Sequence, residues 1–113
     1  MNPLPAELSV LLTTVDERLH ADRLALGLLK ARLVACVQIL PAVTSHYWWK
    51  GELTTSEEWL VMAKLPRDKA AATRAWVERE HPYELPEILF LPVEDCLPAY
   101  GQWIYAQTRE EGE

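Results

Sequence analysis

Residues 43–65, VTSHYWWKGELTTSEEWLVMAKL, contain the pattern from which the architecture of the chain can be inferred. Its first part, residues 43–49, is rich in aromatic and β-favouring side chains, which is typical of a strand. Lys50 and Gly51 form a turn signal, and residues 57–65 alternate between two faces as a returning strand would. The sequence therefore predicts a long β-hairpin.

Strand and helix patterns alternate before this hairpin. Residues 8–14 form a short apolar run that predicts a buried strand, and residues 34–40 predict a second strand that leads into the hairpin. Between them, apolar residues at helical spacing predict a helix over residues 16–33. Thr14 and Glu17 at its start have the spacing of a capping box. The buried stripe of this helix is expected to consist of Ala21, Leu24, Ala25, Leu28 and Leu29.

The chain after the hairpin adds a helix, a strand and a closing helix. A helix begins at Pro66 and must stop before Pro82, because the residue before a proline is pushed out of the helical region. Residues 88–93 read as a strand whose Pro92 marks a sheet edge, and Pro98 can start the last helix. The inner stripe of the middle helix is expected to consist of Ala72, Thr73, Trp76 and Val77. The order βαββαβ predicts an α+β, ferredoxin-like sandwich, in which both main helices pack on one face of an antiparallel sheet.

The predicted hairpin is longer than so small a sheet requires, and Pro41 predicts a bulge or bend near its base. Its outer half must either stand in water or pair with another copy of the chain. Pairing would satisfy edge backbone groups and bury the aromatic rings. Cyclic symmetry would repeat the contact without leaving an open edge, so we expect a closed assembly of copies.

Composition limits the classes of function. The chain has 113 residues, 50% of them hydrophobic, which predicts one domain over residues 1–113 with a core at about 8–107. A net charge of −6 without a cluster of Lys and Arg argues against binding of nucleic acid. No window approaches the roughly 20 apolar residues of a membrane helix, and residues 1–7 do not have a signal-peptide pattern. Two distant cysteines, Cys36 and Cys96, predict free thiols in the cytoplasm.

Four motifs resemble the CutA (divalent-cation tolerance) family. Residues 33–41, LVACVQILP, are similar to its LAACVNIxP stretch, and residues 45–51, SHYWWKG, to its SxYxWxG hairpin. Residues 81–88, HPYELPEI, resemble the HPYxxPEI signature, and residues 100–104, YGQWI, resemble the closing YxxWI. The similarity implies a ferredoxin-like protomer in a tight homotrimer, and a role in tolerance of divalent metals, chiefly copper, with no established reaction.

The resemblance also implies a candidate ligand. Some members bind copper or other divalent ions, and the family's trimer is similar to that of the PII signalling proteins, which leaves small-effector binding as the alternative. The chain departs from the family pattern at three positions that bear on copper. Thr13 and Thr14 stand where some members carry a cysteine, and Glu80 stands where they carry a second histidine. These changes weaken a copper site transferred from other members.

Candidate ligands for a divalent metal ion, copper first, are His81, Glu80, Glu84 and Glu87, since imidazole and carboxylates suit copper or zinc. No His-x-x-x-His, Cys-x-x-Cys or Asp-rich calcium loop accompanies them. The alternative for His81 is a capping role, in which its N–H groups meet free carbonyls at the helix end. Cys36 is a weaker candidate ligand because it lies in an apolar strand. No other cofactor is expected.

A second candidate site is a cleft between subunits. Its expected residues are Tyr47, Trp49, Glu58, Lys64, Tyr83 and Trp103. With His81 and Glu87 nearby, acid–base chemistry is one interpretation, in which Glu58 or Glu87 is the base and His81 the acid. No nucleophile, oxyanion donor or phosphate loop accompanies the set, which favours a structural network with Glu58 paired to Lys64. We therefore expect no catalytic residues and no enzyme activity.

Overall fold

The computed structural model describes residues 7–109 as a four-stranded sheet with three α-helices. In chain order the elements are β1 (Leu8–Val15), α1 (Arg18–Lys30), β2 (Cys36–Trp49), β3 (Glu52–Pro66), a 3₁₀ helix (Arg67–Lys69), α2 (Ala70–Glu80), β4 (Leu89–Pro92) and α3 (Pro98–Gln107). The predicted start of the middle helix at Pro66 is wrong, because Pro66 still pairs with Leu8 in the sheet. All strand pairs are antiparallel, and the strand order is β2-β3-β1-β4. This topology confirms the predicted ferredoxin-like α+β fold.

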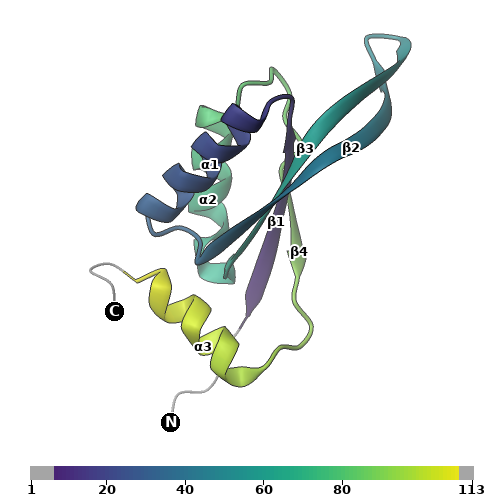
Figure 1. Cartoon of the computed structure of the whole chain (residues 1–113). Coiled ribbons are helices and arrows are strands. Elements are labelled where there is room, and N and C mark those ends of the chain that lie inside the picture. Colours follow the sequence, from purple (N-terminus) through teal and green to yellow (C-terminus); the bar gives the residue numbers. More distant parts are fainter. Residues whose placement is uncertain (1–6, 110–113) are drawn as a thin grey trace.

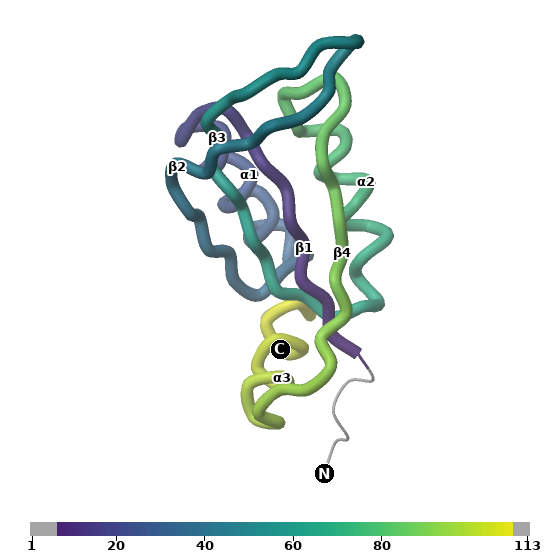
Figure 2. Tube along the Cα trace, turned by 90° about the vertical axis from the view of Figure 1, so that its right-hand side faces the viewer, coloured from purple at the N-terminus to yellow at the C-terminus, as the bar shows by residue number. Residues whose placement is uncertain are grey.

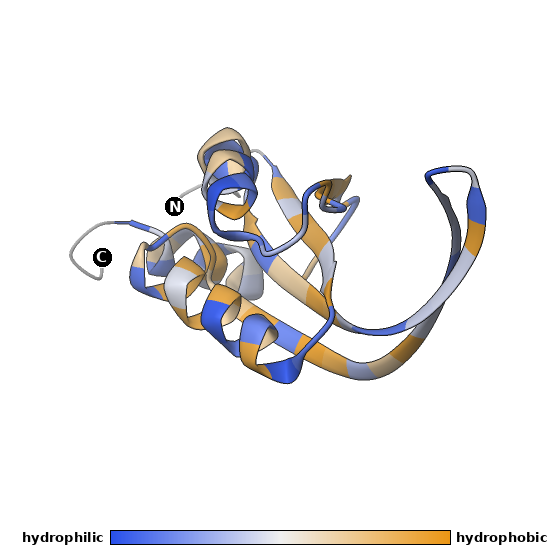
Figure 3. Cartoon of the chain, turned by 90° about the horizontal axis from the view of Figure 1, so that it is seen from above, coloured by the Kyte–Doolittle hydropathy of each residue, from blue (hydrophilic) through white to orange (hydrophobic). Residues whose placement is uncertain are grey.

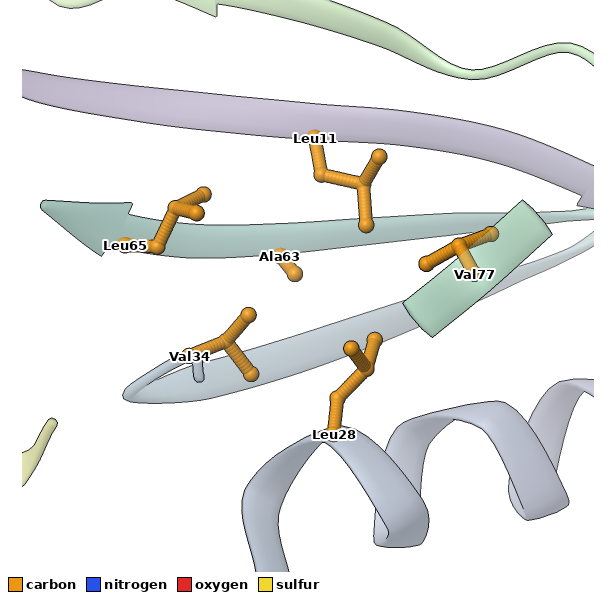
Figure 4. Packing of buried hydrophobic residues seen from close by; sticks show 6 residues of the cluster. All are labelled: Leu11, Leu28, Val34, Ala63, Leu65 and Val77. Atoms are coloured by element: carbon orange, nitrogen blue, oxygen red, sulfur yellow. The ribbon is translucent and has the colours of Figure 1, made fainter. Parts of the chain in front are cut away.

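The core lies between the sheet and the two helices α1 and α2, which cover one face of it (Figure 1). Leu11 of β1 pairs with Ala63 of β3, so both side chains point to the same face. They meet Leu28 of α1 and Val77 of α2, and all four are fully buried (Figure 4). Burial of a Leu or Val side chain stabilises the fold by about 1.5–3 kcal/mol. The predicted stripe of α1 is confirmed at Ala21, Leu24, Ala25 and Leu28.

The hairpin of β2 and β3 is the longest feature of the molecule. Lys50 and Gly51 both have positive φ, 51° and 83°, which is the geometry of a two-residue type I′ turn. A register shift between Leu40 and Val43 confirms the bulge predicted at Pro41. Beyond the bulge the hairpin leaves the body of the protein and curves (Figure 3). Figure 2 shows that it rises toward the loop that follows α2.

The opposite face of the sheet is free of α1 and α2. Residues paired across the strands share this face, among them Leu12 with Met62 and Leu89, and Leu60 with Leu40. α3 covers only one end of it, where Ile104 packs against Leu8 and Ala35. The rest of this face carries apolar side chains such as Leu12, Met62 and Leu89, together with the polar side chains of Gln38 and Lys64, and these residues are half-buried or exposed.

The boundaries of α1 differ from the prediction. The helix begins at Arg18, and Glu17 at its N-cap makes no side-chain hydrogen bond, so the predicted capping box does not form. Thr14 instead continues β1 and pairs with Leu60. The helix ends at Lys30, earlier than predicted, because Arg32 adopts a positive φ of 60° that a right-handed helix cannot contain.

α2 also differs in detail from the prediction. Its buried residues are Thr73 and Val77, with Trp76 half-buried beside them, whereas Ala72 is exposed. The inner stripe is narrower than predicted, and its apolar contacts with the sheet and α1 are made by Trp76 and Val77. None of the helices within residues 7–109 combines the length and the hydropathy of a membrane-spanning segment. Apart from Glu7, the prediction about a signal peptide concerns residues outside the described part.

Candidate functional site

A pocket of about 750 Å³ opens between the β2–β3 hairpin and residues 83–87, which follow α2. Its lining consists of Thr14, Ser45, His46, Tyr47, Trp49, Glu58, Tyr83, Glu84, Leu85, Pro86 and Glu87. Three elements and one irregular segment therefore contribute to it, namely β1, β2, β3 and the chain after α2. The volume lies in the range of small-molecule sites, which is about 300–1,000 Å³.

Glu58 is the buried acid of this pocket, with 6% of its surface exposed. Its Oε1 accepts a hydrogen bond from Ser45 Oγ at 2.6 Å, and its Oε2 accepts one from the Tyr83 hydroxyl at 2.6 Å. Both donors are neutral, so they stabilise the carboxylate without cancelling its charge. Burial, followed by the hydrogen bond to Glu58, raises the pKa of Tyr83 far above its ordinary value. Tyr83 therefore keeps its proton and remains a donor.

The electrostatic character of the pocket is negative. Glu84 and Glu87 lie at its exposed part with Glu58 below, and the lining contains neither Lys nor Arg. The ion pairs found within residues 7–109 involve none of these three carboxylates. Partial burial of the Glu87 carboxyl, and then the charge of Glu58, raise the pKa of Glu87. The described residues thus leave the pocket with negative charge that no cation of the same chain neutralises.

His81 lies beside the pocket and is buried. Its Nδ1 accepts a hydrogen bond from the backbone N–H of Tyr83 at 3.0 Å, and its Nε2–H donates to the Thr14 carbonyl at 2.9 Å. These partners require the neutral tautomer with the proton on Nε2. Burial lowers the pKa of His81, which favours the same state. Neither nitrogen is free to bind a metal ion.

The alternative interpretation of His81 is a cap on free carbonyls at the end of α2. The residue is indeed the C-cap, and its backbone N–H bonds to the Val77 carbonyl. Its side chain, however, bonds to β1 instead of to the helix, and its ring contacts Tyr83 edge-on with centroids 4.8 Å apart. His81 therefore fixes the chain after α2 against the sheet, which positions Tyr83 over Glu58.

The four predicted metal ligands do not gather within one chain. Glu84 and Glu87 share the pocket lining, but His81 uses both nitrogens elsewhere, and Glu80 forms an ion pair with Arg79 at 3.6 Å. Within residues 7–109 there is no group of three or more His, Cys, Asp or Glu that could hold a metal ion. The residues of a single described chain therefore do not fit a transition-metal site.

The six residues expected in a cleft divide into two groups. Tyr47, Trp49, Glu58 and Tyr83 line the pocket. Lys64 lies farther along β3, where it donates to the side chain of Gln38, and Trp103 stacks on Tyr100 of α3. Within one chain Glu58 and Lys64 do not pair, because six residues of strand separate them by about 20 Å even though they share a face. A pair between Glu58 of one copy and Lys64 of another stays a prediction.

Sequence reasoning missed Ser45 and Thr14 as site residues. A signal for Ser45 existed, because counting back from the two-residue turn pairs Val43 with Glu58 and places Ser45 on the same face of the hairpin. The hydroxyl is then within reach of the carboxylate. Thr14 contributes through its backbone carbonyl and its place on the neighbouring strand, and no local pattern marks such a role.

The sequence of the chain is similar to those of known proteins of one family. The family model described as CutA1 divalent ion tolerance protein matches residues 9–107. The Protein CutA homolog of Xenopus laevis is 38% identical over 97 residues, which cover 86% of this chain and 64% of that protein. The Divalent-cation tolerance protein CutA of Yersinia pestis (strain Pestoides F) is 37% identical, covering 86% of this chain and 82% of that protein.

Solved structures agree with these sequence relationships. The divalent cation tolerance protein (Cut A1) from Thermus thermophilus has a TM-score of 0.87 and 34% identity, covering 90% of this chain and 99% of that chain. The present chain spans only about three fifths of the length of the curated Xenopus laevis and Mus musculus relatives, 64% and 59%. The match over residues 9–107 covers far more than half of the sequence. The chain therefore belongs to the CutA1 divalent ion tolerance protein family.

Proposed function

We propose that the chain acts as a homotrimer in the tolerance of divalent cations, copper among them, and that it does so by binding and not by catalysis. The family and its tolerance role come from the comparisons. The observation that carries the assembly is the apolar face of the sheet that α1 and α2 leave uncovered.

That face exposes more apolar surface than a small monomer can tolerate easily. Leu40, Leu89 and Leu91 are 39%, 52% and 46% exposed, and they lie on β2 and β4 at the two edges of the sheet. Separate from that face, Trp48 and Leu53 near the tip of the hairpin are 72% and 69% exposed and pair in register, on the side of the two strands opposite to Glu58. Exposed apolar surfaces of this kind mark interfaces. Cyclic assembly of three copies would cover the face and the edges together.

The hydrogen bonds of the pocket support binding over catalysis. A general acid or base needs a group that can exchange a proton with a substrate in reach. Both nitrogens of His81 are engaged with backbone groups, and the hydroxyl of Tyr83 is committed to Glu58. We therefore assign no catalytic residue. The free thiols of Cys36 and Cys96 support the cytoplasm as the compartment.

The carboxylates Glu84 and Glu87 are the predicted ligands that stay accessible in one place, so we propose that they bind divalent cations weakly. Isothermal titration calorimetry of the purified protein with Cu²⁺ and with Zn²⁺ tests this. We expect small heats that decrease in Glu84→Gln and are retained in Glu80→Gln, which changes an acid outside the pocket. Heats equal to a buffer blank for both ions would remove direct binding from the proposal and leave an indirect role in tolerance.

A second candidate function is that of a module that binds a small effector, similar to the PII proteins. The pocket itself favours it, because about 750 Å³ lined by Tyr47, Trp49 and Tyr83 is far larger than a single ion requires. A thermal-shift screen of small molecules tests this function, since a ligand that binds only the folded state must raise the melting temperature. A flat screen at millimolar ligand would count against it.

A further inference from the structure

We propose that the pocket beside the hairpin binds a small organic cation, an ammonium group carried on an apolar body. This inference rests on the second candidate function, binding of a small effector in the same pocket, and names the class of ligand. Three properties of the lining lead to it: the sign of its charge, the chemistry of its walls and its size.

The charge of the pocket selects a cation. Glu58 is buried, and its two oxygens accept hydrogen bonds from the hydroxyls of Ser45 and Tyr83, so this carboxyl group lies in a poorly solvated place with no cationic partner among the described residues. Glu84 and Glu87 add two carboxylates at the exposed part of the lining. Since no Lys or Arg of the lining offsets them, an anionic or phosphorylated ligand would be repelled, and a cation would be attracted.

The walls select an organic cation. Tyr47, Trp49 and Tyr83 contribute aromatic rings, and Leu85 and Pro86 contribute apolar surface. The faces of such rings attract cations, most strongly when the cation is partly desolvated. Trp49 already has one cationic neighbour, the ammonium of Lys50, 5.6 Å from its ring centroid. A ligand that carries its charge on a hydrophobic body can use the carboxylates and the rings together.

Size and donor geometry argue against a bare metal ion as the main occupant. Within residues 7–109 no three potential ligands converge, and the nearest imidazole, that of His81, has no free nitrogen. A cavity of about 750 Å³ would leave a single ion largely in water. An ammonium group instead needs only acceptors at hydrogen-bond distance and a surface for its carbon atoms, which this lining supplies.

The test uses three probes of one shape and different charge: 2-phenylethylammonium, the neutral 2-phenylethanol and the anionic phenylacetate. Each is titrated into the purified protein while amide chemical shifts are recorded. We expect the ammonium probe to shift amides of residues 45–49 and 83–87, and to bind at least about tenfold more tightly than the alcohol or the carboxylate. Glu87→Gln should weaken it at least about fivefold. Glu80→Gln, an exposed acid outside the lining, should leave it unchanged.

Several results would overturn the assignment. Equal affinity for the ammonium and the alcohol probes would show that the site selects for apolar surface and not for charge. Chemical-shift changes at amides outside residues 45–49 and 83–87 would show that the probe binds somewhere else. No response to any probe would mean that a side chain of a neighbouring subunit, or nothing, occupies the pocket. If Glu87→Gln alters folding, Tyr47→Leu serves as the second variant, and unchanged affinity there would contradict the role of the rings. A response to another ligand in the thermal-shift screen, without one to 2-phenylethylammonium, would leave effector binding intact and reject only this ligand class.

Discussion

Among single residues, His81 has a role that is determined by its tertiary contacts and not by the sequence around it. By sequence it is a candidate metal ligand at the end of a helix, next to Pro82. The partner that decides its role is the Thr14 carbonyl, 67 positions away in the chain. No local pattern reveals such a contact, because it exists only after β1 and the end of α2 are side by side. The histidine is thus a structural link between two elements.

Replacement of His81 by Ala should destabilise the fold without changing copper binding. The variant leaves the Thr14 carbonyl and the Tyr83 N–H without their partner, and an unsatisfied buried group costs about 1–3 kcal/mol. Urea unfolding at pH 8, together with copper calorimetry, measures both effects. Unchanged stability combined with lost copper binding would restore His81 as a ligand.

The stability of the wild type should also depend on pH through His81. Burial lowers its pKa in the folded state below the ordinary value of 6.5, so the unfolded chain takes up the proton first. Its contribution is therefore complete above pH 6.5 and decreases as the pH falls through that value. His81→Gln should unfold with a weaker dependence on pH in this range, and an equal dependence in both proteins would contradict this account.

At the scale of elements, α1 and α2 pack closely at Gly27. A Cβ atom at this position would lie 2.5 Å from Cζ2 and 2.6 Å from Cη2 of Trp76, closer than atoms approach in proteins. Trp76 packs against two core clusters, so its ring has little room to retreat. Glycine is therefore required here by the approach of the neighbouring helix, although it lowers helix propensity.

Gly27→Ala should decrease the free energy of unfolding by about 1 kcal/mol. Alanine gains about 1 kcal/mol of helix propensity over glycine, but overpacking a filled contact costs about 1–3 kcal/mol, so the steric cost prevails. Denaturant unfolding measures the change, and Leu26→Ala on the exposed side of the same helix is the control. In Trp76→Leu, where the ring is absent, Gly27→Ala should become stabilising. A stabilising Gly27→Ala in the wild-type background would contradict the contact.

Helices and strands with a regular repeat of apolar residues could be predicted from the sequence. The residues at which they end and the side chains that they contact could not. The alternation of β3 placed Val61, Ala63 and Leu65 on one face, since period two depends only on the strand itself, and the structure shows that this face is the buried one. The capping box at Glu17 failed because pairing with β3 continued β1 through Thr14, a tertiary effect. In the site, the position of Glu58 on the hairpin could be predicted from the strand pattern. Its hydrogen bond with Tyr83 could not, because Tyr83 follows α2 and approaches Glu58 only in the folded chain.

At the scale of the whole molecule, the hairpin makes the chain unusually elongated. The described part extends over 53 × 27 × 23 Å, and its radius of gyration is 15.0 Å, whereas a compact domain of 100 residues has about 13 Å. The excess comes from the two strands of the hairpin, which leave the body of the protein as Figure 3 shows. Their aromatic side chains Tyr47, Trp48 and Trp49 are exposed. Such a shape is stable when other copies cover the hairpin and the apolar face of the sheet.

Mass determination by light scattering at micromolar concentration tests this assembly most directly, with Trp48→Asp as the variant at the hairpin and Leu19→Asp, an exposed leucine on α1, as its control. We expect the wild type and Leu19→Asp to have three times the 12.9 kDa of one chain, and Trp48→Asp to dissociate or become insoluble. A wild-type protein that remains a folded monomer, or a Trp48→Asp variant that stays a folded trimer, would contradict it.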